Sequence, residues 1–470
     1  MEILDSVLSF LNTVIWEYLL IYVLIGTGIY FTIRTKFVQF RRFPHLFGVM
    51  AGSRHCEGGG ISPFQAFCVS MASRVGTGNI AGVAIALTLG GPGAVFWMWC
   101  VALVGMATAF VEATLAQLYK VPQPDGTFRG GPAYYIQRGL GSRGWGIVFA
   151  VLLIFTFGLA FNAVQANTIA DVLGESFGVP TIVTGIVLAL ICAPIFFGGI
   201  RSVARVAEWM MPIMAAIYIV LALVIVAVHI DRIPDVFMLI VRSAFGLDQA
   251  AAGAFGGLSA ALLNGAKRGL FSNEAGMGSA PNMAATATTI HPATQGFIQA
   301  LGVFVDTIVI CSATAFIILL SDQYDPTGAT EMAGASLTQS AIASEFGSVG
   351  GLFMTFVIFL FAFSSIIGNY AYADGNMTFL GARVKVLNVF RIVAVLAVFG
   401  GSIGELPTVW AMADVAMGLM ALVNLGAILM LSKWAMAALA DYEAGERKGL
   451  PHFEASGNRH MPGALPTEVW

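Results

Sequence analysis

Charged side chains are scarce in this 470-residue chain. Asp, Glu, Lys and Arg make up 10% of its residues, 58% are hydrophobic, and the mean hydropathy is +0.83. A soluble domain carries about 25% charged residues. A chain this apolar could not cover a water-facing surface with polar groups, so the composition predicts a polytopic membrane protein. The net charge of −3 gives no reason to expect a nucleic-acid partner.

Residue clusters typical of catalysis and metal binding are also missing. The chain has six His and five Cys residues, with no H-E-x-x-H or C-x-x-C, so we expect no zinc site and interpret the cysteines as free buried thiols. There is no G-x-x-x-x-G-K-[ST], which speaks against an ATP-driven pump. An intramembrane enzyme needs clustered His, Asp or Cys, and the apolar segments contain almost no His. We therefore expect no enzymatic activity and no organic cofactor.

Long apolar segments dominate the chain instead. A membrane-spanning helix needs about 20 apolar residues. The segments that meet this requirement lie at residues 14–34, 63–90, 93–118, 145–171, 180–199, 206–229, 255–288, 295–320, 350–380, 387–403 and 408–432. The sequence thus predicts an all-α fold of eleven transmembrane helices. The N-terminus begins with acidic residues and has no clear cleavage site, so the first segment is expected to be retained.

Basic residues fall almost entirely on one side of this topology when the gaps are assigned alternately to two sides. One side receives only Arg232 and Arg242, with many acidic residues. The other side receives Arg34, Lys36, Arg41, Arg42, Arg54, Lys120, Arg129, Arg138, Arg143, Arg201, Arg205, Lys267, Arg268, Arg383, Lys385, Arg391, Lys433, Arg447, Lys448 and Arg459. The positive-inside rule then predicts a multi-pass cell-membrane protein with its N-terminus outside and its C-terminus in the cytoplasm.

Glycine and proline concentrate in the second and seventh segments. These contain "VSMASRVGTGNIAGVAIALTLGGPGAVFWMW" and "GAFGGLSAALLNGAKRGLFSNEAGMGSAPN". If the first segment is set aside, the two interrupted segments open two halves of five helices each. Interrupted helices at matching positions are typical of inverted-repeat secondary transporters. The predicted organisation is an extra helix and basic linker at 1–60, repeats at 61–230 and 255–432, and a cytoplasmic tail at 433–470.

The stretch "SRVGTGNIAG" admits three interpretations. Its G-x-G-x-x-A spacing resembles a dinucleotide-binding turn, but the preceding residues belong to a long apolar segment and the acid expected about 20 residues later is missing. A glycine kink that only aids helix packing is a second interpretation. A broken helix is the third: unwinding in a membrane frees backbone groups that persist only where they line a cavity or bind a ligand. Free N–H groups suit a carboxylate and free carbonyls suit a cation.

Several long motifs resemble the alanine or glycine:cation symporter family. They are "MASRVGTGNIAGVAIALTLGGPGAVFWMW", "RGLFSNEAGMGSAP", "FVDTIVICSATA" and "IIGNYAYADGN", and the likeness runs in order over nearly the whole chain. The resemblance implies sodium-coupled symport of small neutral amino acids, chiefly alanine and also glycine, by alternating access. It also implies the fold of the bacterial leucine transporter, with two inverted five-helix repeats and here an extra N-terminal helix.

The resemblance implies a sodium site made of backbone and hydroxyl oxygens. Carbonyls of Ala72 and Val75 would meet the Phe361 carbonyl and the hydroxyls of Ser364 and Ser365. Hard oxygens of this kind suit Na⁺, the expected coupling ion. The alternative for the two serines is back-bonding to carbonyls of their own helix.

The substrate site implied by the resemblance surrounds the glycine-rich turn. Its expected members are Thr77, Gly78, Asn79, Gln165, Phe271, Gly276, Met277 and Ser365. The backbone N–H groups and hydroxyl around Thr77 to Asn79 would hold the amino-acid carboxylate. Either Asn162 or Gln165, three apart on one helical face, could face the cavity, and interhelical hydrogen bonding is their alternative role. The alternative role of Phe271 is packing between helices.

Arg74 departs from the pattern of leucine-type transporters, which have alanine there beside a second sodium site. A fixed cation should repel Na⁺, so we expect a single sodium site. An intramembrane charge needs a partner, for which Glu274 and Asp374 are the candidates. Glu112 and Asp306 are mid-helix acids that could be structural acceptors or proton-linked groups.

Two functions other than symport stay open at this point, a channel and a sensor. A channel could also use broken helices, although no ring-type charge repeat or T-V-G-Y-G is present. A sensor could bind an amino acid without moving it. The expected partners are a small amino acid and the lipid bilayer, and the expected oligomeric state is a monomer.

Overall fold

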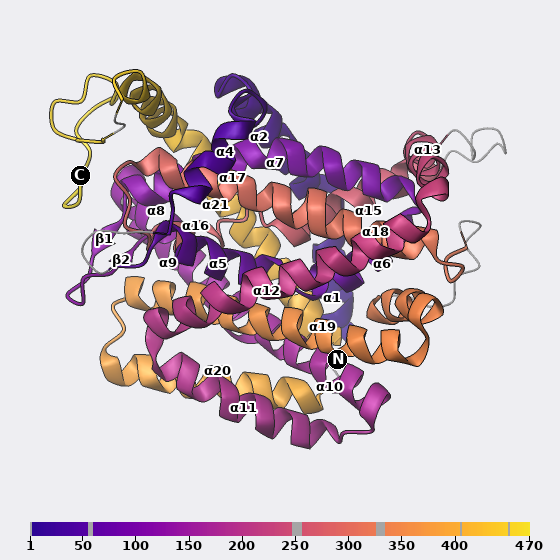
Figure 1. Ribbon diagram of the computed structural model, residues 1–470. Coiled ribbons are helices and arrows are strands. Elements are labelled where there is room, and N and C mark those ends of the chain that lie inside the picture. Colours follow the sequence, from indigo (N-terminus) through magenta and orange to yellow (C-terminus); the bar gives the residue numbers. More distant parts are fainter. Residues whose placement is uncertain (1, 55–59, 247–255, 326–333, 405–406, 450–451) are drawn as a thin grey trace.

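The computed structural model describes residues 2–54, 60–246, 256–325, 334–404, 407–449 and 452–470, and this part of the chain is almost entirely helical. Its one small sheet pairs β1 (Val121–Pro122) with β2 (Phe128–Arg129) in antiparallel fashion. Most helices run side by side as a bundle, with the C-terminus at one end and α13 (Ile233–Ala244) at the other (Figure 1). We call these the C-terminal end and the α13 end.

The element bounds follow the predicted segments closely. Before the first break lie α1 (Glu2–Asn12), η1 (Thr13–Leu20), α2 (Ile21–Arg34), α3 (Val38–Arg41), α4 (Phe43–Ala51) and α5 (Pro63–Arg74). The elements between this break and α13 are η2 (Gly78–Gly82), α6 (Val83–Gly90), α7 (Gly93–Leu118), α8 (Pro132–Leu140), α9 (Arg143–Leu153), η3 (Ile154–Phe161), α10 (Asn162–Phe177), α11 (Thr181–Phe197), α12 (Gly199–Val228) and η4 (Ile230–Arg232). The rest comprises α15 (Gly256–Asn273), α16 (Pro281–Ala284), α17 (Pro292–Val303), η5 (Phe304–Cys311), α18 (Ser312–Leu320), α19 (Ala335–Phe379), α20 (Val384–Ile403) and α21 (Pro407–Glu446).

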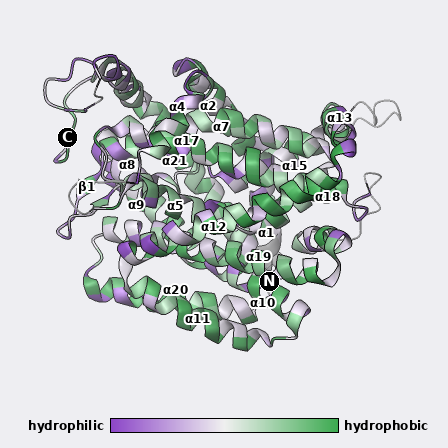
Figure 2. Ribbon diagram, in the orientation of Figure 1, coloured by the Kyte–Doolittle hydropathy of each residue, from purple (hydrophilic) through white to green (hydrophobic). Residues whose placement is uncertain are grey.

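Eight helical stretches of the described chain are long and apolar enough to cross a membrane. They are Ser6–Arg34, Gly93–Leu118, Arg143–Phe177, Gly199–Val228, Pro292–Leu320, Ala335–Phe379, Val384–Ile403 and Thr408–Glu446. Large apolar side chains such as Leu190, Trp209 and Val220 face outward on the bundle, and hydrophobic colour covers most helices in Figure 2. The fold is therefore that of a helical polytopic membrane protein. The count of eleven spans, the inverted repeats and the repeat boundaries stay predictions.

The helices form layers around two interrupted segments. The helix α7 packs against α15 and α17, α5 contacts both α12 and α19, and α10 and α11 pack on α20 at one edge (Figure 1). Very close approach is possible where the residue is glycine: a Cβ on Gly368 of α19 would lie 2.5 Å from the backbone N of Ser73 in α5. The α5–α19 contact therefore depends on Gly368.

Three details differ from the predicted topology. Lys267 and Arg268 lie inside α15 rather than in a gap, so they do not contribute to the charge asymmetry between the two sides. The ninth predicted span, 350–380, is preceded by helical residues from 335 onward, with a kink at Gly347, where φ is 64°. The last helix, α21, continues beyond residue 432 to Glu446.

The C-terminal segment folds back onto the bundle. The indole Nε1 of Trp470 donates a hydrogen bond to the Gln117 carbonyl at 2.9 Å, and the backbone N of Phe453 donates to the Ile290 carbonyl at 3.1 Å. The neighbouring His291 caps the start of α17: its Nδ1 accepts the N–H of Ala293 at 3.0 Å, while its Nε2 lies 3.2 Å from Asp441 Oδ2. This pairing requires a neutral ring with the proton on Nε2.

Candidate functional site

The glycine-rich turn after α5 breaks the helix. The helix begins with a capping box between Ser62 and Gln65 and ends at Arg74. Beyond it, the N–H of Gly76 donates to Asn79 Oδ1 at 3.0 Å, and the N–H of Asn79 donates to the Gly76 carbonyl at 3.2 Å. In an unbroken helix these two N–H groups would bond to the carbonyls of Ala72 and Val75. The break therefore frees these two carbonyls for other partners.

Two serines of α19 meet the freed carbonyls. The Ser364 hydroxyl lies 3.2 Å from the Ala72 carbonyl, 3.3 Å from that of Val75 and 2.8 Å from that of Phe361. The Ser365 hydroxyl lies 3.1 Å from the Phe361 carbonyl and 3.2 Å from that of Ser73. All five residues implied as sodium ligands are thus brought together from two elements, and all are buried.

A small cavity of about 30 Å³ adjoins this cluster. A water needs at least about 10–15 Å³, so the cavity has room for about two waters. It is lined by Ser73, Arg74, Gly76, Gly78, Phe157, Phe161, Gln165, Phe271, Glu274, Asn369 and Met417. Three residues expected in the substrate site, Gly78, Gln165 and Phe271, therefore line one cavity beside the oxygen cluster.

The other expected substrate residues lie outside the wall of this cavity. Thr77, Asn79 and Ser365 belong to the break and to the oxygen cluster behind the lining. Gly276 and Met277 follow the second break, and a Cβ on Gly276 would meet Leu24, Leu425 and Thr108. Asn162 turns to its own helix and donates to the Gly158 carbonyl at 3.2 Å.

An aromatic layer of three rings packs at one wall of the cavity. The ring centroids of Phe161 and Phe271 are 5.6 Å apart, and Trp410 of α21 lies 6.0 Å from Phe161 and 6.2 Å from Phe271. Offset and tilted ring pairs at these distances add about 0.5–1.5 kcal/mol each beyond area burial. Phe161 and Phe271 line the cavity, and Trp410 packs against both of these rings.

The second break follows α15 and places a carboxylate at the cavity. Glu274 has φ of 55°, and Gly276 and Gly278 have φ of 85° and 81°. A left-handed backbone is strained for a residue with a Cβ and is held only by its surroundings. Glu274 accepts hydrogen bonds from the hydroxyls of Ser279 at 2.6 Å, Ser73 at 3.3 Å and Tyr372 at 3.3 Å.

Asn79 and the two mid-helix acids are tied into the packing between helices. Asn79 Nδ2 donates to Asp306 Oδ1 at 2.7 Å and to Ser272 Oγ at 2.9 Å. Asp306 also accepts from the hydroxyls of Ser272 and Thr307. Glu112 accepts from the Gly276 N–H at 3.2 Å and from Asn424 Nδ2 at 3.0 Å. Both acids thus act as hydrogen-bond acceptors in this structure.

Arg74 has no hydrogen-bond partner among the described residues, and no carboxylate oxygen of that part of the chain lies within 4.0 Å of it. The second candidate partner, Asp374, is not paired with Arg74, because Asp374 pairs with Arg129 at 3.3 Å and lies 3.8 Å from Arg391. Glu274 lines the same cavity and attracts Arg74 electrostatically, but the two form no ion pair.

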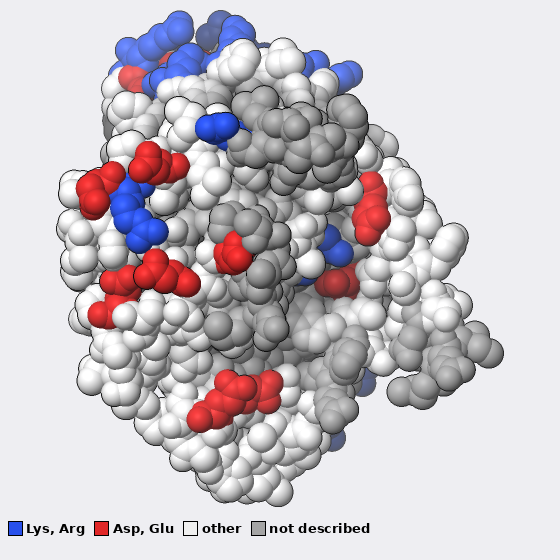
Figure 3. Space-filling model, turned by 90° about the vertical axis from the view of Figure 1, so that its right-hand side faces the viewer, with Lys and Arg blue, Asp and Glu red and all other residues white. Residues whose placement is uncertain are grey.

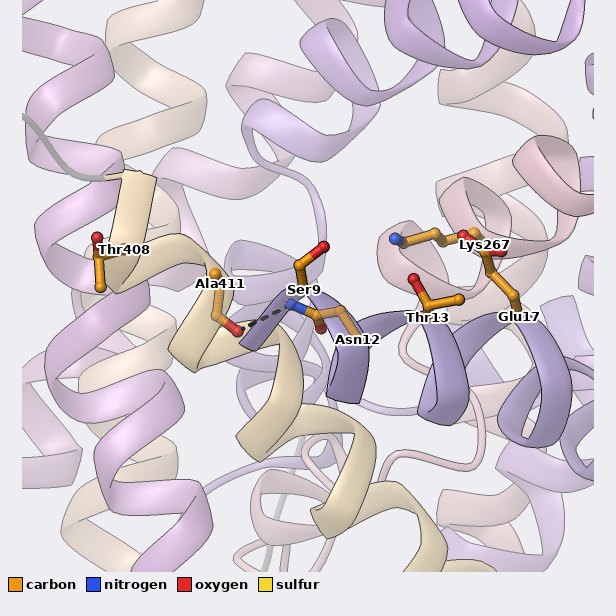
Figure 4. Close-up of a pocket in the computed structure, with 7 residues that line it drawn as sticks. All are labelled: Ser9, Asn12, Thr13, Glu17, Lys267, Thr408 and Ala411. Carbon is orange, nitrogen blue, oxygen red and sulfur yellow. Dashed lines mark hydrogen bonds between the residues drawn. The ribbon is translucent and has the colours of Figure 1, made fainter. Parts of the chain in front are cut away.

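A larger hollow of about 440 Å³ lies at the edge of the bundle, where α1 and η1 meet α15 and α21 (Figure 4). Asn12 Nδ2 donates to the Ala411 carbonyl there at 3.2 Å, and the charges of Lys267 and Glu17 attract each other. This hollow contains no broken helix. The smaller cavity is the better candidate because it joins both breaks, two opposite charges and the oxygen cluster.

Ser73, Glu274, Asn369 and Met417 are cavity residues that sequence reasoning did not assign to the substrate site. Asn369 could have been found, because it lies one helical turn after Ser365 on the same helix. Its Oδ1 accepts a hydrogen bond from Ser73 Oγ at 2.6 Å. Nothing local in the sequence marks Met417, which reaches the cavity through the packing of α21.

Comparison with known proteins decides the family. The model of the sodium:alanine symporter family matches residues 1–455. The chain belongs to the sodium:alanine symporter family. It is 50% identical to the amino-acid carrier protein AlsT of Bacillus subtilis over 99% of this chain and 97% of that protein. It is 48% identical to the probable sodium/glutamine symporter GlnT of the same organism, over 95% of this chain and 92% of that protein.

Further relatives of this family member agree on transport as the activity. The sodium/alanine symporter AgcS of Methanococcus maripaludis is 40% identical over 91% of this chain and 94% of that protein. Among solved structures, a manganese transporter of Eremococcus coleocola has a TM-score of 0.53 and 15% identity, covering 83% of this chain and 82% of that chain. The latter likeness shows the fold only. The chain is thus a membrane transporter and not an enzyme.

Proposed function

We propose that this chain couples the uptake of a small neutral amino acid to Na⁺ by alternating access. The oxygen cluster at the first break carries the proposal. Ser364 and Ser365 bring their hydroxyls to four carbonyls, two of which the break has released from helical bonding. Carbonyl and hydroxyl oxygens are typical ligands of hard cations. A Na⁺ held by Ala72, Val75, Phe361, Ser364 and Ser365 would tie α5 to α19.

Alanine is the proposed substrate, with glycine as a second small substrate. The cavity beside the cluster has room for about two waters in this structure, so even alanine requires the walls at Phe161 and Phe271 to move apart, and a small substrate requires the least movement. The carboxylate would lie at the backbone N–H groups of Thr77 to Asn79, where the helix restarts and its dipole favours a negative group. The Asn79 N–H would then exchange its present acceptor, the Gly76 carbonyl, for the carboxylate. Gln165, Phe271, Gly276, Met277 and Ser365 complete the proposed substrate site. Arg74 beside the cavity favours one sodium ion per cycle rather than two.

Glutamine is the alternative substrate, and one observation favours it. Gln165 Oε1 is buried in the cavity wall without a hydrogen-bond partner among the described residues. It could accept the N–H of a side-chain amide, and the relative GlnT is named a probable sodium/glutamine symporter. Glutamine would require the aromatic layer to move further than alanine does.

The proposed membrane topology keeps the eleven spans, the inverted repeats of five helices and the extra N-terminal helix. The N-terminus would lie outside and the C-terminus in the cytoplasm of a monomer in the cell membrane. Figure 3 views the α13 end, where several groups of acidic side chains stand on a largely uncharged face and basic side chains appear mainly along the upper edge. This distribution supports an outward-facing α13 end.

Binding of labelled alanine to the purified protein in NaCl and in KCl tests the proposal. We expect saturable binding in NaCl that is at least about tenfold weaker in KCl, and competition by unlabelled alanine and glycine. Stronger competition by glutamine than by alanine would favour the alternative substrate. Equal binding in both salts would refute sodium coupling.

A further inference from the structure

Arg74 carries a buried charge whose hydrogen-bonding capacity is unused. Its side chain is 3% exposed, and Nε, Nη1 and Nη2 all lack partners among the described residues. A guanidinium has five N–H donors, and burying one without partners costs several kcal/mol. Gly302 of α17 leaves space for this group, since a Cβ there would lie 2.8 Å from Nη1. The charge is therefore accommodated sterically but not satisfied chemically.

A carboxylate stands in the same cavity without neutralising it directly. Glu274 and Arg74 both line the cavity, and they are more than 4.0 Å apart at their closest charged atoms. Three hydroxyls fix Glu274 on a left-handed backbone. The Glu274 carboxylate is therefore fixed in position by these hydrogen bonds, while the Arg74 guanidinium has no ion-pair partner among the described residues.

Two further acids lie near Arg74. The carboxyl groups of Glu112 and Asp306 also attract it, although neither is within ion-pair distance among the described contacts. Each of them is already satisfied by neutral donors from neighbouring helices. Neither acid takes up the N–H groups of Arg74, which stay free for a ligand.

We infer that Arg74 binds the α-carboxylate of the transported amino acid and that Glu274 binds its α-ammonium. The inference rests on the proposed function and names the two charges that recognise the substrate. A zwitterion placed between these side chains satisfies both, and a guanidinium can hold a carboxylate by two parallel N–H···O bonds. The N–H groups of the broken helix can share the same carboxylate. The site would then select compounds that carry both charges.

Competition against sodium-dependent uptake of labelled alanine into proteoliposomes tests this inference. The competitors are alanine, alaninamide, which lacks the carboxylate, and lactate, which lacks the ammonium. In the wild-type protein we expect alaninamide and lactate each to compete at least about tenfold more weakly than alanine. Charge-assisted hydrogen bonds of about 1.5–3 kcal/mol correspond to roughly 10- to 100-fold in affinity. Alaninamide competing as well as alanine would overturn the inference without any variant.

Variants then assign the preference to the two residues. In Arg74→Met we expect the preference for alanine over alaninamide to fall at least about tenfold, and in Glu274→Gln the preference for alanine over lactate. Arg74→Lys keeps the charge without the planar fork, so it should retain part of the preference if Arg74→Met does not fold. Arg129→Met is the matched control, because Arg129 is also buried but pairs with Asp374 away from the cavity.

The outcomes separate this inference from the proposed function. Sodium-independent alanine uptake by the wild-type protein would refute the proposed function, whatever the variants do. Sodium-dependent uptake with unchanged competitor ratios in Arg74→Met, or in Arg74→Lys if only that variant folds, would overturn the role of Arg74 alone. Equal losses in Arg129→Met and Arg74→Met would also overturn it, because they would reflect a general loss of stability.

Discussion

Replacing Ser365 by alanine should weaken the dependence on sodium more than it weakens the fold. The Ser365 hydroxyl lies 3.1 Å from the Phe361 carbonyl and 3.2 Å from the Ser73 carbonyl, and it is 1% exposed. The change removes one of five proposed Na⁺ ligands. Hydrogen bonds to charged groups contribute about 1.5–3 kcal/mol, and we take a similar value for one ligand oxygen. Each 1.4 kcal/mol of binding free energy corresponds to a tenfold change in the dissociation constant.

The expected result is therefore a rise of roughly 10- to 100-fold in the sodium concentration that gives half-maximal alanine uptake. The assay is uptake into proteoliposomes over a series of sodium concentrations, with protein abundance and melting temperature measured in parallel. Ser402→Ala is the matched control, because Ser402 is also buried and its hydroxyl bonds to its own helix, at the Val398 carbonyl, 3.1 Å away. Wild-type sodium dependence in Ser365→Ala would refute the ligand assignment.

Three further expectations concern the breaks and the C-terminal end. Asn79→Leu should abolish alanine binding and lower the melting temperature, because it leaves Asp306 Oδ1 and the Gly76 N–H unsatisfied at about 1–3 kcal/mol each; a wild-type melting temperature would contradict this role. Gly368→Ala should separate α5 from α19 and reduce sodium-dependent uptake at least about tenfold, and normal uptake would show that this contact tolerates a methyl group. Burial lowers the pKa of His291 below 6.5, so the unfolded chain binds its proton first as the pH falls and stability should drop below about pH 6.5. His291→Asn keeps a cap without titrating, and it should remove part of this drop in a melting-temperature series; an unchanged pH profile would contradict the reasoning.

The position of both breaks could be predicted from the sequence, because glycine clusters inside apolar segments are a local signal. The five oxygens of the proposed sodium site could be named only through a family resemblance. Their meeting depends on Gly368, which lets α19 approach α5, and on hydrogen bonds that Asn79 takes away from the helix. Periodicity alone would have favoured back-bonding of both serines.

The surroundings of Arg74 could not be predicted, because they depend on contacts between distant helices. Asp374 was the second candidate partner from the sequence, after Glu274, but the turn containing Arg129 folds back against it. The strained backbone of Glu274 is also invisible locally, since nothing marks a glutamate for a left-handed conformation. Asn79 was expected at the substrate, whereas its amide bonds to Asp306 and Ser272.

The central claim is that the movement of an amino acid is driven by a sodium gradient. Uptake of labelled alanine into proteoliposomes tests it most directly, with an inward Na⁺ gradient compared with an equal K⁺ gradient. We expect accumulation above the external concentration only with the Na⁺ gradient, and its collapse when a sodium ionophore is added. Equal, non-accumulating uptake in both salts would contradict the account.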